Sequence, residues 1–252
     1  MTMKRGRIVL MALLLIAAAS TALAQRGGGF RSQSYSNNTR YDGKFVFVRM
    51  SYPTNTFRNP GWAHDYPTGE IHFMKILTSV SNISAHVEET NILDFGDPEM
   101  FKFPLIYLVE PGFWQMNEEQ VKNLRDYLKK GGFMIVDDFP DRAWQQFDLQ
   151  MSAVFPEGRW IDLEDTSHPI FHSFFEINSL DLIPQAYFLG GPPKFRALFE
   201  DNDPNKRMYV IANYQSDLSE FWEFSEVGIY PIDASNEAYK LGVNEFIYGI
   251  TH

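Results

Sequence analysis

The sequence predicts an α/β fold with a mostly parallel central sheet that helices cover on both faces. Its expected strands are continuously apolar rather than alternating, as in "FPLIYLVE" (103–110) and "FMIV" (133–136). A clear helix pattern separates these two strands, and no repeat or Pro/Gly-rich linker divides the chain after residue 43. Strands that are apolar on both faces and alternate with helices are typical of a parallel sheet within one domain.

The first 42 residues are not expected to belong to this domain. Three basic residues precede an apolar stretch at 8–19, which is too short to span a bilayer, and "ALA" fits a cleavage site after Ala24. We therefore expect residues 1–24 to be a signal peptide and the mature protein to be periplasmic or extracellular, without a transmembrane segment. An uncleaved anchor is the alternative. Residues 25–42 are expected to form a flexible tether, and residues 43–252 a single domain.

Charge and cysteine content exclude several classes of function. Removing the first 24 residues takes away three basic residues and no acidic one, which leaves 19 basic against 32 acidic residues and a net charge of about −13. A surface this acidic argues against nucleic acid or anionic lipid as a partner. The chain has no cysteine, so disulfides, thiolate zinc sites and a cysteine nucleophile are excluded.

The first predicted elements are two strands and a helix. "KFVFVRM" (44–50) has the apolar and β-branched composition of a buried strand, and "AHVEE" (85–89) predicts a second strand. Apolar residues about three positions apart predict a helix over 70–80, with its buried face formed by Ile71, Met74, Leu77 and Val80.

The helix after the strand at 103–110 carries the strongest signals. Asn117 can cap its first turn, two glutamates follow, and two lysines close the last turn before Gly131 and Gly132. The apolar side chains of this helix are Val121, Leu124 and Leu128.

The second half is less regular. A helix is expected to begin near Asp141, with an apolar face of Ala143, Trp144, Phe147, Met151 and Val154. "RWIDL" (159–163) and "KRMYVIANY" (206–214) predict strands joined by long loops, and a helix from about Ser235 ends the chain.

The acidic doublet of "GGFMIVDDFPD" (131–141) gives the fold a candidate site. Asp137 and Asp138 end a central strand, and ligands of open α/β sheets bind at the carboxyl edge of the strands. One aspartate could instead cap the helix that follows, which is an equally good interpretation. The loop "WAHDYP" (62–67) follows the first strand and is expected to open on the same edge.

His64 and Asp65 of that loop are the expected partners of the doublet. Histidine can move a proton or bind a metal, and a neighbouring acid can orient it. His64, Asp65, Asp137 and Asp138 are thus the catalytic candidates. The structural alternative is a polar loop whose Trp62 and Tyr66 pack on the domain.

Further residues are candidates for ligand binding. Glu110 ends the strand at 103–110, and His168 lies in "HPIFH" (168–172). "SDLSEFWEF" (216–224) combines aromatic and acidic residues, as a carbohydrate pocket does, although an acidic surface loop has the same composition. We include these ligand-binding candidates: Trp62, Tyr66, Glu110, His168, Asp217, Trp222 and Glu223.

No cofactor is predicted, but clustered carboxylates leave a divalent cation site open. Ca²⁺ or Mg²⁺ binds such oxygen ligands. The histidines form no HExxH pattern and the acids no EF-hand loop, so the sequence does not identify a metal.

Five blocks of the sequence together resemble a known family. They are "DPEMFKFPLIYL" (97–108), "LRDYLKKGGFMIVDDF" (124–139), "HPIFHSFF" (168–175), "YQSDLSEFWEF" (214–224) and "LGVNEFIYGI" (241–250). In order and spacing they resemble the DUF4159 family, a bacterial and often exported family of unknown function. Its domain is similar to class I glutamine amidotransferases, which implies a flavodoxin-like three-layer α/β sandwich over about residues 44–250.

The resemblance does not supply a reaction. Amidotransferases use a cysteine on a sharp turn after a central strand, and this chain has "VDDF" at about that place. Glutamine hydrolysis by a thiolate is therefore excluded.

Three hypotheses remain for the function. The first is a ligand-binding or envelope assembly module that holds a small molecule, a carbohydrate or an envelope protein. The second is a non-thiol hydrolase that uses His64 with Asp137 or Asp138, with or without a metal. It predicts His64 within hydrogen-bond reach of a carboxylate, whereas a binding module should show an aromatic groove. The third is a purely structural envelope component with a flat apolar patch.

Overall fold

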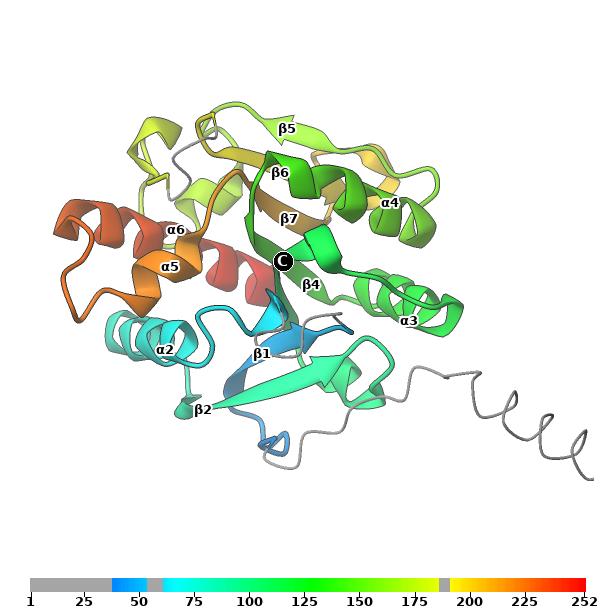
Figure 1. The fold of residues 1–252 in the computed structure, drawn as a ribbon, viewed down its shortest axis with the longest axis horizontal. Coiled ribbons are helices and arrows are strands. Elements are labelled where there is room, and N and C mark those ends of the chain that lie inside the picture. The colour runs from blue at the N-terminus through cyan, green and yellow to red at the C-terminus, as the bar shows by residue number, and fades with distance from the viewer. Residues whose placement is uncertain (1–37, 54–60, 186–190) are drawn as a thin grey trace, which may run out of the picture. The chain divides into compact units, whose positions relative to one another are not determined.

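A seven-stranded sheet forms the centre of the computed structural model, which describes residues 38–53, 61–185 and 191–252 (Figure 1). The strand order is β2-β1-β3-β4-β7-β6-β5. The strands are β1 (Phe45–Ser51), β2 (Ala85–Asp94), β3 (Leu105–Val109), β4 (Phe133–Phe139), β5 (Ile161–Leu163), β6 (Lys194–Phe199) and β7 (Met208–Tyr214).

The sheet is mixed but mostly parallel, as the sequence predicts. β2, β1, β3, β4 and β7 pair in parallel, while β6 runs antiparallel to both β7 and β5. The order β2-β1-β3-β4 is that of a doubly wound flavodoxin-like sheet, in which the order of successive strands across the sheet reverses between β1 and β3. In open α/β sheets, ligands bind outside the carboxyl ends of the strands at such a reversal.

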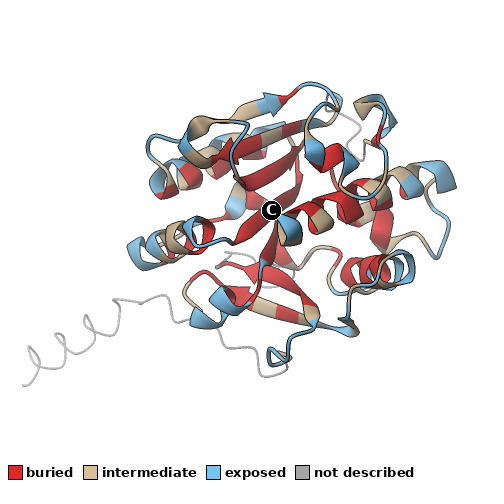
Figure 2. Cartoon of the chain, turned by 180° about the vertical axis from the view of Figure 1, so that it is seen from behind, coloured by how far each residue is buried: buried red, intermediate tan, exposed pale blue. Residues whose placement is uncertain are grey.

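Helices cover both faces of this sheet. One face carries α2 (Thr68–Val80), α5 (Leu218–Glu223) and α6 (Ile232–Thr251), and the other carries α3 (Glu118–Lys129) and α4 (Trp144–Val154) (Figure 1). Each face has its own apolar cluster, and the central strands are buried along their length (Figure 2). None of the helices in the described ranges is long and apolar enough to cross a membrane.

The strongest local signals are confirmed at the residues that carry them. The Asn117 side chain accepts a hydrogen bond from the Gln120 amide, and the Gln120 side chain accepts one from the Asn117 amide. This reciprocal capping satisfies two amide donors at the start of α3. The helix near Asp141 begins as a 3₁₀ turn at Asp141–Ala143 and continues as α4.

Other local predictions need correction. Val80 is 40% exposed and Ile71 is only partly buried, whereas Met74 and Leu77 are buried as predicted and share the buried face of α2 with Glu70, His72 and Phe73. β6 was not predicted, because its six residues follow a Gly-Pro-Pro segment that indicates a loop. The predicted signal peptide and residues 25–37 of the tether lie outside the described residues.

Candidate functional site

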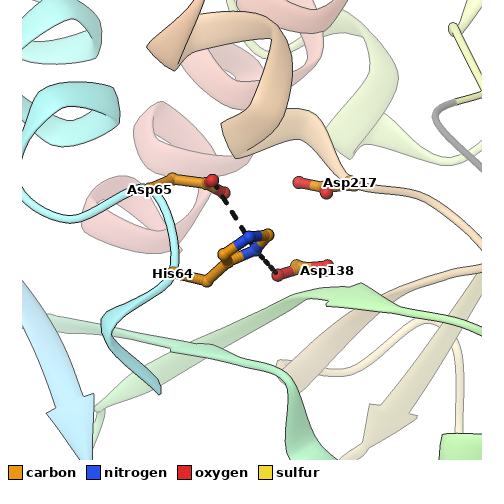
Figure 3. Close-up of side chains that lie close together, drawn as sticks. All are labelled: His64, Asp65, Asp138 and Asp217. Atoms are coloured by element: carbon orange, nitrogen blue, oxygen red, sulfur yellow. Dashed lines mark hydrogen bonds and ion pairs between the residues drawn. The ribbon is translucent and has the colours of Figure 1, made fainter. Parts of the chain in front are cut away.

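Three segments of the chain bring the candidate residues together at the carboxyl edge of the sheet. His64 and Asp65 follow β1 through the 3₁₀ turn Gly61–Ala63, Asp138 lies near the end of β4, and Asp217 follows β7 and caps α5. In Figure 3 the imidazole of His64 lies between Asp65 and Asp138, with Asp217 beside them. This edge includes the end of β1, next to which the strand order across the sheet reverses.

The four side chains are close enough to share one ligand. His64 Nδ1 lies 3.0 Å from Asp138 Oδ2 and 3.6 Å from Asp65 Oδ1. One ligand atom from each of His64, Asp65, Asp138 and Asp217 falls within 4.8 Å of the other three. The carboxylates of Asp65 and Asp138 are buried, whereas the His64 side chain is 43% exposed and reachable from solvent.

The backbone is unusual where these acids lie. Asp65 (φ 61°), Asp138 (φ 53°) and Glu110 (φ 48°) adopt left-handed conformations, which residues other than glycine rarely do. These are three of the six such non-glycine residues in the described ranges. Backbone strain of this kind gathers at functional sites, because packing must hold it in place.

The acidic doublet divides into one structural and one site-facing residue. Asp137 is fully buried, and its Oδ2 accepts hydrogen bonds from Tyr107 Oη (2.7 Å), Leu218 N (2.8 Å) and Ser219 N (3.1 Å). It therefore anchors the first turn of α5 to the sheet. Burial raises the pKa of Asp137 to about 6, although the Tyr107 bond opposes the shift. Asp138 instead faces His64.

A serine and a histidine form hydrogen bonds with the carboxylates of the site. Ser219 Oγ lies 2.8 Å from Asp65 Oδ2 and 3.1 Å from Asp217 Oδ1, so its hydroxyl donates to one of them at a time. The hydrogen bond to Asp138 raises the pKa of His64 to about 9. Without another cation, the protonated imidazole is therefore the positive charge inside the cluster.

The remaining acids show how much negative charge gathers here. Burial, reinforced by repulsion from Asp138, raises the pKa of Glu110 to about 7 and raises the pKa of Asp217 well above its usual range. Burial and the neighbouring Asp65 raise the pKa of Glu223 to about 7. The site thus combines one imidazole with carboxyl groups that are difficult to ionise together.

The charge of Arg49 reaches Asp65 but does not neutralise the cluster. Its guanidinium forms a buried ion pair with Glu70, with Nε 2.6 Å from Glu70 Oε1. Arg49 Nη1 also donates to the Trp62 carbonyl oxygen, and the guanidinium lies over the Tyr107 ring. Arg49 therefore supports the loop that carries His64.

The aromatic candidates are mostly structural parts of the domain. Trp222 is 1% exposed and packs against Phe73, so it belongs to the core. Trp62 is 9% exposed and contacts Tyr66, whose hydroxyl lies 2.5 Å from Thr90 Oγ1.

His168 lies away from the cluster. Its Nδ1 accepts a hydrogen bond from the Ile170 amide at the start of a 3₁₀ turn, and its ring packs on Phe199 and Tyr248. Tyr248 in turn contacts Phe133, which begins β4 at the end opposite Asp138. His168 is thus at the other edge of the sheet.

Sequence reasoning missed Ser219, and it noted Glu220 as an acidic residue of the segment 216–224 without including it among the candidates. Glu220 forms a second close group with Asp65 and Glu223. The pattern of Asp217 followed three positions later by Glu220 is a helix-start signal, and it could have placed both residues in the first turn of α5.

The fold and this site define a cysteine-free α/β domain with an acidic, histidine-containing cluster at the carboxyl edge of its sheet. The chain matches the family model described as "Domain of unknown function (DUF4159)" over residues 44–250. This match covers most of its length, so the chain belongs to that family. A search of curated proteins finds no match.

Proposed function

We propose that this domain binds a divalent cation between His64, Asp65, Asp138 and Asp217 and uses it in a hydrolytic reaction. The observation that carries the proposal is the convergence of four ligand atoms, from three separate segments of the chain, within 4.8 Å of one another. A second observation supports it. Asp65 Oδ1 is buried and has no hydrogen-bond partner within the described ranges, although water or a cation would satisfy it.

The distances suit a coordinated cation. Two ligands at right angles, each about 2.1 Å from a metal, stand about 3.0 Å apart, and wider angles increase this separation. The measured 3.0 Å and 3.6 Å from His64 Nδ1 to the two carboxylates fall in this range. The shorter distance is also that of a charged hydrogen bond, so a proton and a cation compete for Nδ1.

The ligand set favours a transition metal over Ca²⁺. Imidazole nitrogen suits Zn²⁺ and Fe²⁺, whereas carboxylate oxygens alone suit Mg²⁺, Ca²⁺ and Mn²⁺. One histidine with three aspartates combines both preferences, so we expect Mn²⁺, Fe²⁺ or Zn²⁺ to bind more tightly than Ca²⁺ or Mg²⁺.

Hydrolysis fits the site better than an aromatic binding groove. His64 is within hydrogen-bond distance of a carboxylate, as the hydrolase hypothesis requires, while Trp222 is enclosed in the core. Glu110 is half-buried, and its backbone amide donates a hydrogen bond to the carbonyl oxygen of Asp138. We assign the role of general base, which accepts a proton during the reaction, to the nearby carboxylate of Glu110. A bound cation would polarise the substrate oxygen.

A ligand-binding or assembly module is the second candidate. It is favoured by Asp137, whose Oδ2 is satisfied by two main-chain amides and a tyrosine rather than held for chemistry. In this version the same cation would hold a small molecule, a carbohydrate or an envelope protein. Both versions include export directed by residues 1–24, as the sequence predicts.

Calorimetric titration of residues 25–252 with MnCl₂, ZnCl₂, CaCl₂ and MgCl₂ tests the proposal. We expect binding of Mn²⁺ or Zn²⁺ that weakens at least about 10-fold in His64→Gln, because a coordinating nitrogen is lost. His172→Gln is the matched control, since His172 pairs with Glu176 on the surface. If no cation binds, the proposal fails.

Turnover separates the two candidates. Chromogenic esters, phosphate esters and glycosides should be tested with the preferred cation and after chelation. Cation-dependent turnover supports the hydrolase. Cation binding without turnover of any of them leaves the binding module.

A further inference from the structure

Asp65 belongs to a second group of close carboxylates. One oxygen each from Asp65, Glu220 and Glu223 lie within 4.8 Å of one another. Glu220 and Glu223 are three residues apart on α5, so they lie on the same side of that short helix. Both are only partly buried, which leaves this group accessible to ions from solvent.

Asp65 provides an observation that is independent of the acidic composition. It is 6% exposed, and its backbone is held in a left-handed conformation at φ 61°. Its Oδ2 accepts from Ser219 Oγ, but its Oδ1 has no hydrogen-bond partner within the described ranges. The 3.6 Å from Oδ1 to His64 Nδ1 is too long for a hydrogen bond. Asp65 is thus a buried carboxylate that both acidic groups share, and one of its oxygens has only the longer ion pair with His64 and no hydrogen bond to any described residue, which leaves it free to bind a cation.

Basic side chains do not neutralise this second group. In the three described ranges, neither Glu220 nor Glu223 forms an ion pair with a lysine or arginine. The contact recorded for Glu220 is a hydrogen bond from Tyr230 Oη to its Oε1, at 2.6 Å. Carboxylates this close repel unless a proton or a cation lies between them.

We propose that a second divalent cation binds between Asp65, Glu220 and Glu223, so that Asp65 bridges two cations. This inference rests on the proposed function, because the first cation occupies the group that contains His64. The two groups contain five different carboxylates and one imidazole. One divalent cation leaves most of that negative charge uncompensated, whereas two bring it close to balance.

The bridging arrangement predicts properties that a single cation does not have. Two cations joined by one carboxylate lie about 3.5 to 4 Å apart in the two-metal sites of hydrolases. Two Mn²⁺ ions at that separation are magnetically coupled, which distinguishes a bridged pair from two unrelated surface ions. Loss of Glu220 or Glu223 should remove the second ion and leave the first.

Mn²⁺ titration of residues 25–252 by calorimetry, with low-temperature electron paramagnetic resonance, tests this inference. We expect two Mn²⁺ per chain and a coupled spectrum for the unsubstituted protein. Glu223→Gln and Glu220→Gln should each bind one Mn²⁺ with an uncoupled spectrum and weaken the second site at least 10-fold. Glu119→Gln, an exposed substitution on α3, is the control and should keep both ions.

The outcomes separate this inference from the proposed function. One Mn²⁺ per chain, unaffected by Glu223→Gln, overturns the second position and leaves the first cation in place. Loss of both ions in a Glu223→Gln protein with an unchanged circular dichroism spectrum contradicts the inference that the two ions bind at separate positions. No binding to the unsubstituted protein overturns the proposed function as well.

Discussion

Replacing Asp138 by asparagine should separate the site's role in binding from its role in stability. The substitution keeps the shape of the side chain but removes one negative charge from the group of His64, Asp65, Asp138 and Asp217. If this group exists to hold a cation, its carboxylates repel one another when the cation is absent. Asp138→Asn should then reduce the stabilisation by cations to about half or less while changing the cation-free protein little.

The geometry sets the size of both effects. At an effective dielectric constant of about 20, two carboxylates at the 4.8 Å limit of this group repel by about 3.5 kcal/mol, and an ion pair at 3.0 Å attracts by about 5.5 kcal/mol. The attraction to His64 is smaller than this because 43% of that side chain is exposed. The two terms nearly cancel, so we expect the cation-free unfolding free energy to change by less than about 2 kcal/mol.

The cation-dependent effect is a loss of the stabilisation that bound Mn²⁺ provides. At a Mn²⁺ concentration 100 times Kd, the unsubstituted protein gains about 2.7 kcal/mol, or about 5 to 11 °C in Tm for a domain of this size. A 10-fold loss of affinity in Asp138→Asn reduces that gain to about 1.4 kcal/mol or less.

Thermal unfolding followed by circular dichroism, with and without MnCl₂, is the appropriate assay. Asp233→Asn is the matched control, because Asp233 is exposed at the start of α6. The reasoning is refuted if Asp138→Asn keeps the full Mn²⁺-induced shift, or if it destabilises the cation-free protein by well over 2 kcal/mol. Asp138 would then be a structural residue like Asp137.

Four further predictions concern stability and are measured by urea unfolding. Arg49→Met should destabilise by about 3 to 5 kcal/mol, because it leaves Glu70 buried without its partner; a loss below 1 kcal/mol would contradict this. Gly242→Ala should destabilise by about 1 to 3 kcal/mol, since its Cβ would lie 2.5 Å from Trp222 Cζ2; unchanged stability would show that the helix moves freely. Asn117→Ala should destabilise by about 1 kcal/mol through loss of the α3 cap, and no change would mean that water replaces it. Burial, with the nearby charge of His252, lowers the pKa of His168 to about 4. The neutral imidazole therefore contributes its full stabilisation above pH 6.5, and this contribution declines as the pH falls from 6.5 to 4. His168→Asn should remove about 1 kcal/mol of this pH dependence of the unfolding free energy, and a pH profile identical to that of the unsubstituted protein would contradict the prediction.

The sequence was sufficient for the architecture because its signals are local. Continuous apolar runs predict buried parallel strands, and the Asn117 cap with the glycines after Lys130 fixes the limits of α3. β6 could not be predicted from such signals, since an antiparallel edge partner of β7 is specified by pairing rather than by its own pattern. The buried Glu70 of α2 was missed for a related reason, because only its partner Arg49 on β1 makes its burial tolerable.

The candidate site was predicted in outline but not in its internal division of roles. Strand-end placement brought His64 and Asp138 to one edge, because parallel strands end together. Whether Asp137 or Asp138 faces the site depends on the left-handed backbone at Asp138, which no residue pattern encodes. The inclusion of Asp217 depends on the position of α5 against the sheet, which is a tertiary property.

The most direct test of the cation site is a crystal structure of residues 25–252 grown with MnCl₂ and measured at the manganese absorption edge. The account predicts an anomalous difference peak between His64 Nδ1 and the carboxylates of Asp65, Asp138 and Asp217, at about 2.0 to 2.4 Å from each ligand atom. A cation-free site in which His64 still bonds Asp138, with manganese absent or bound elsewhere on the surface, would contradict it.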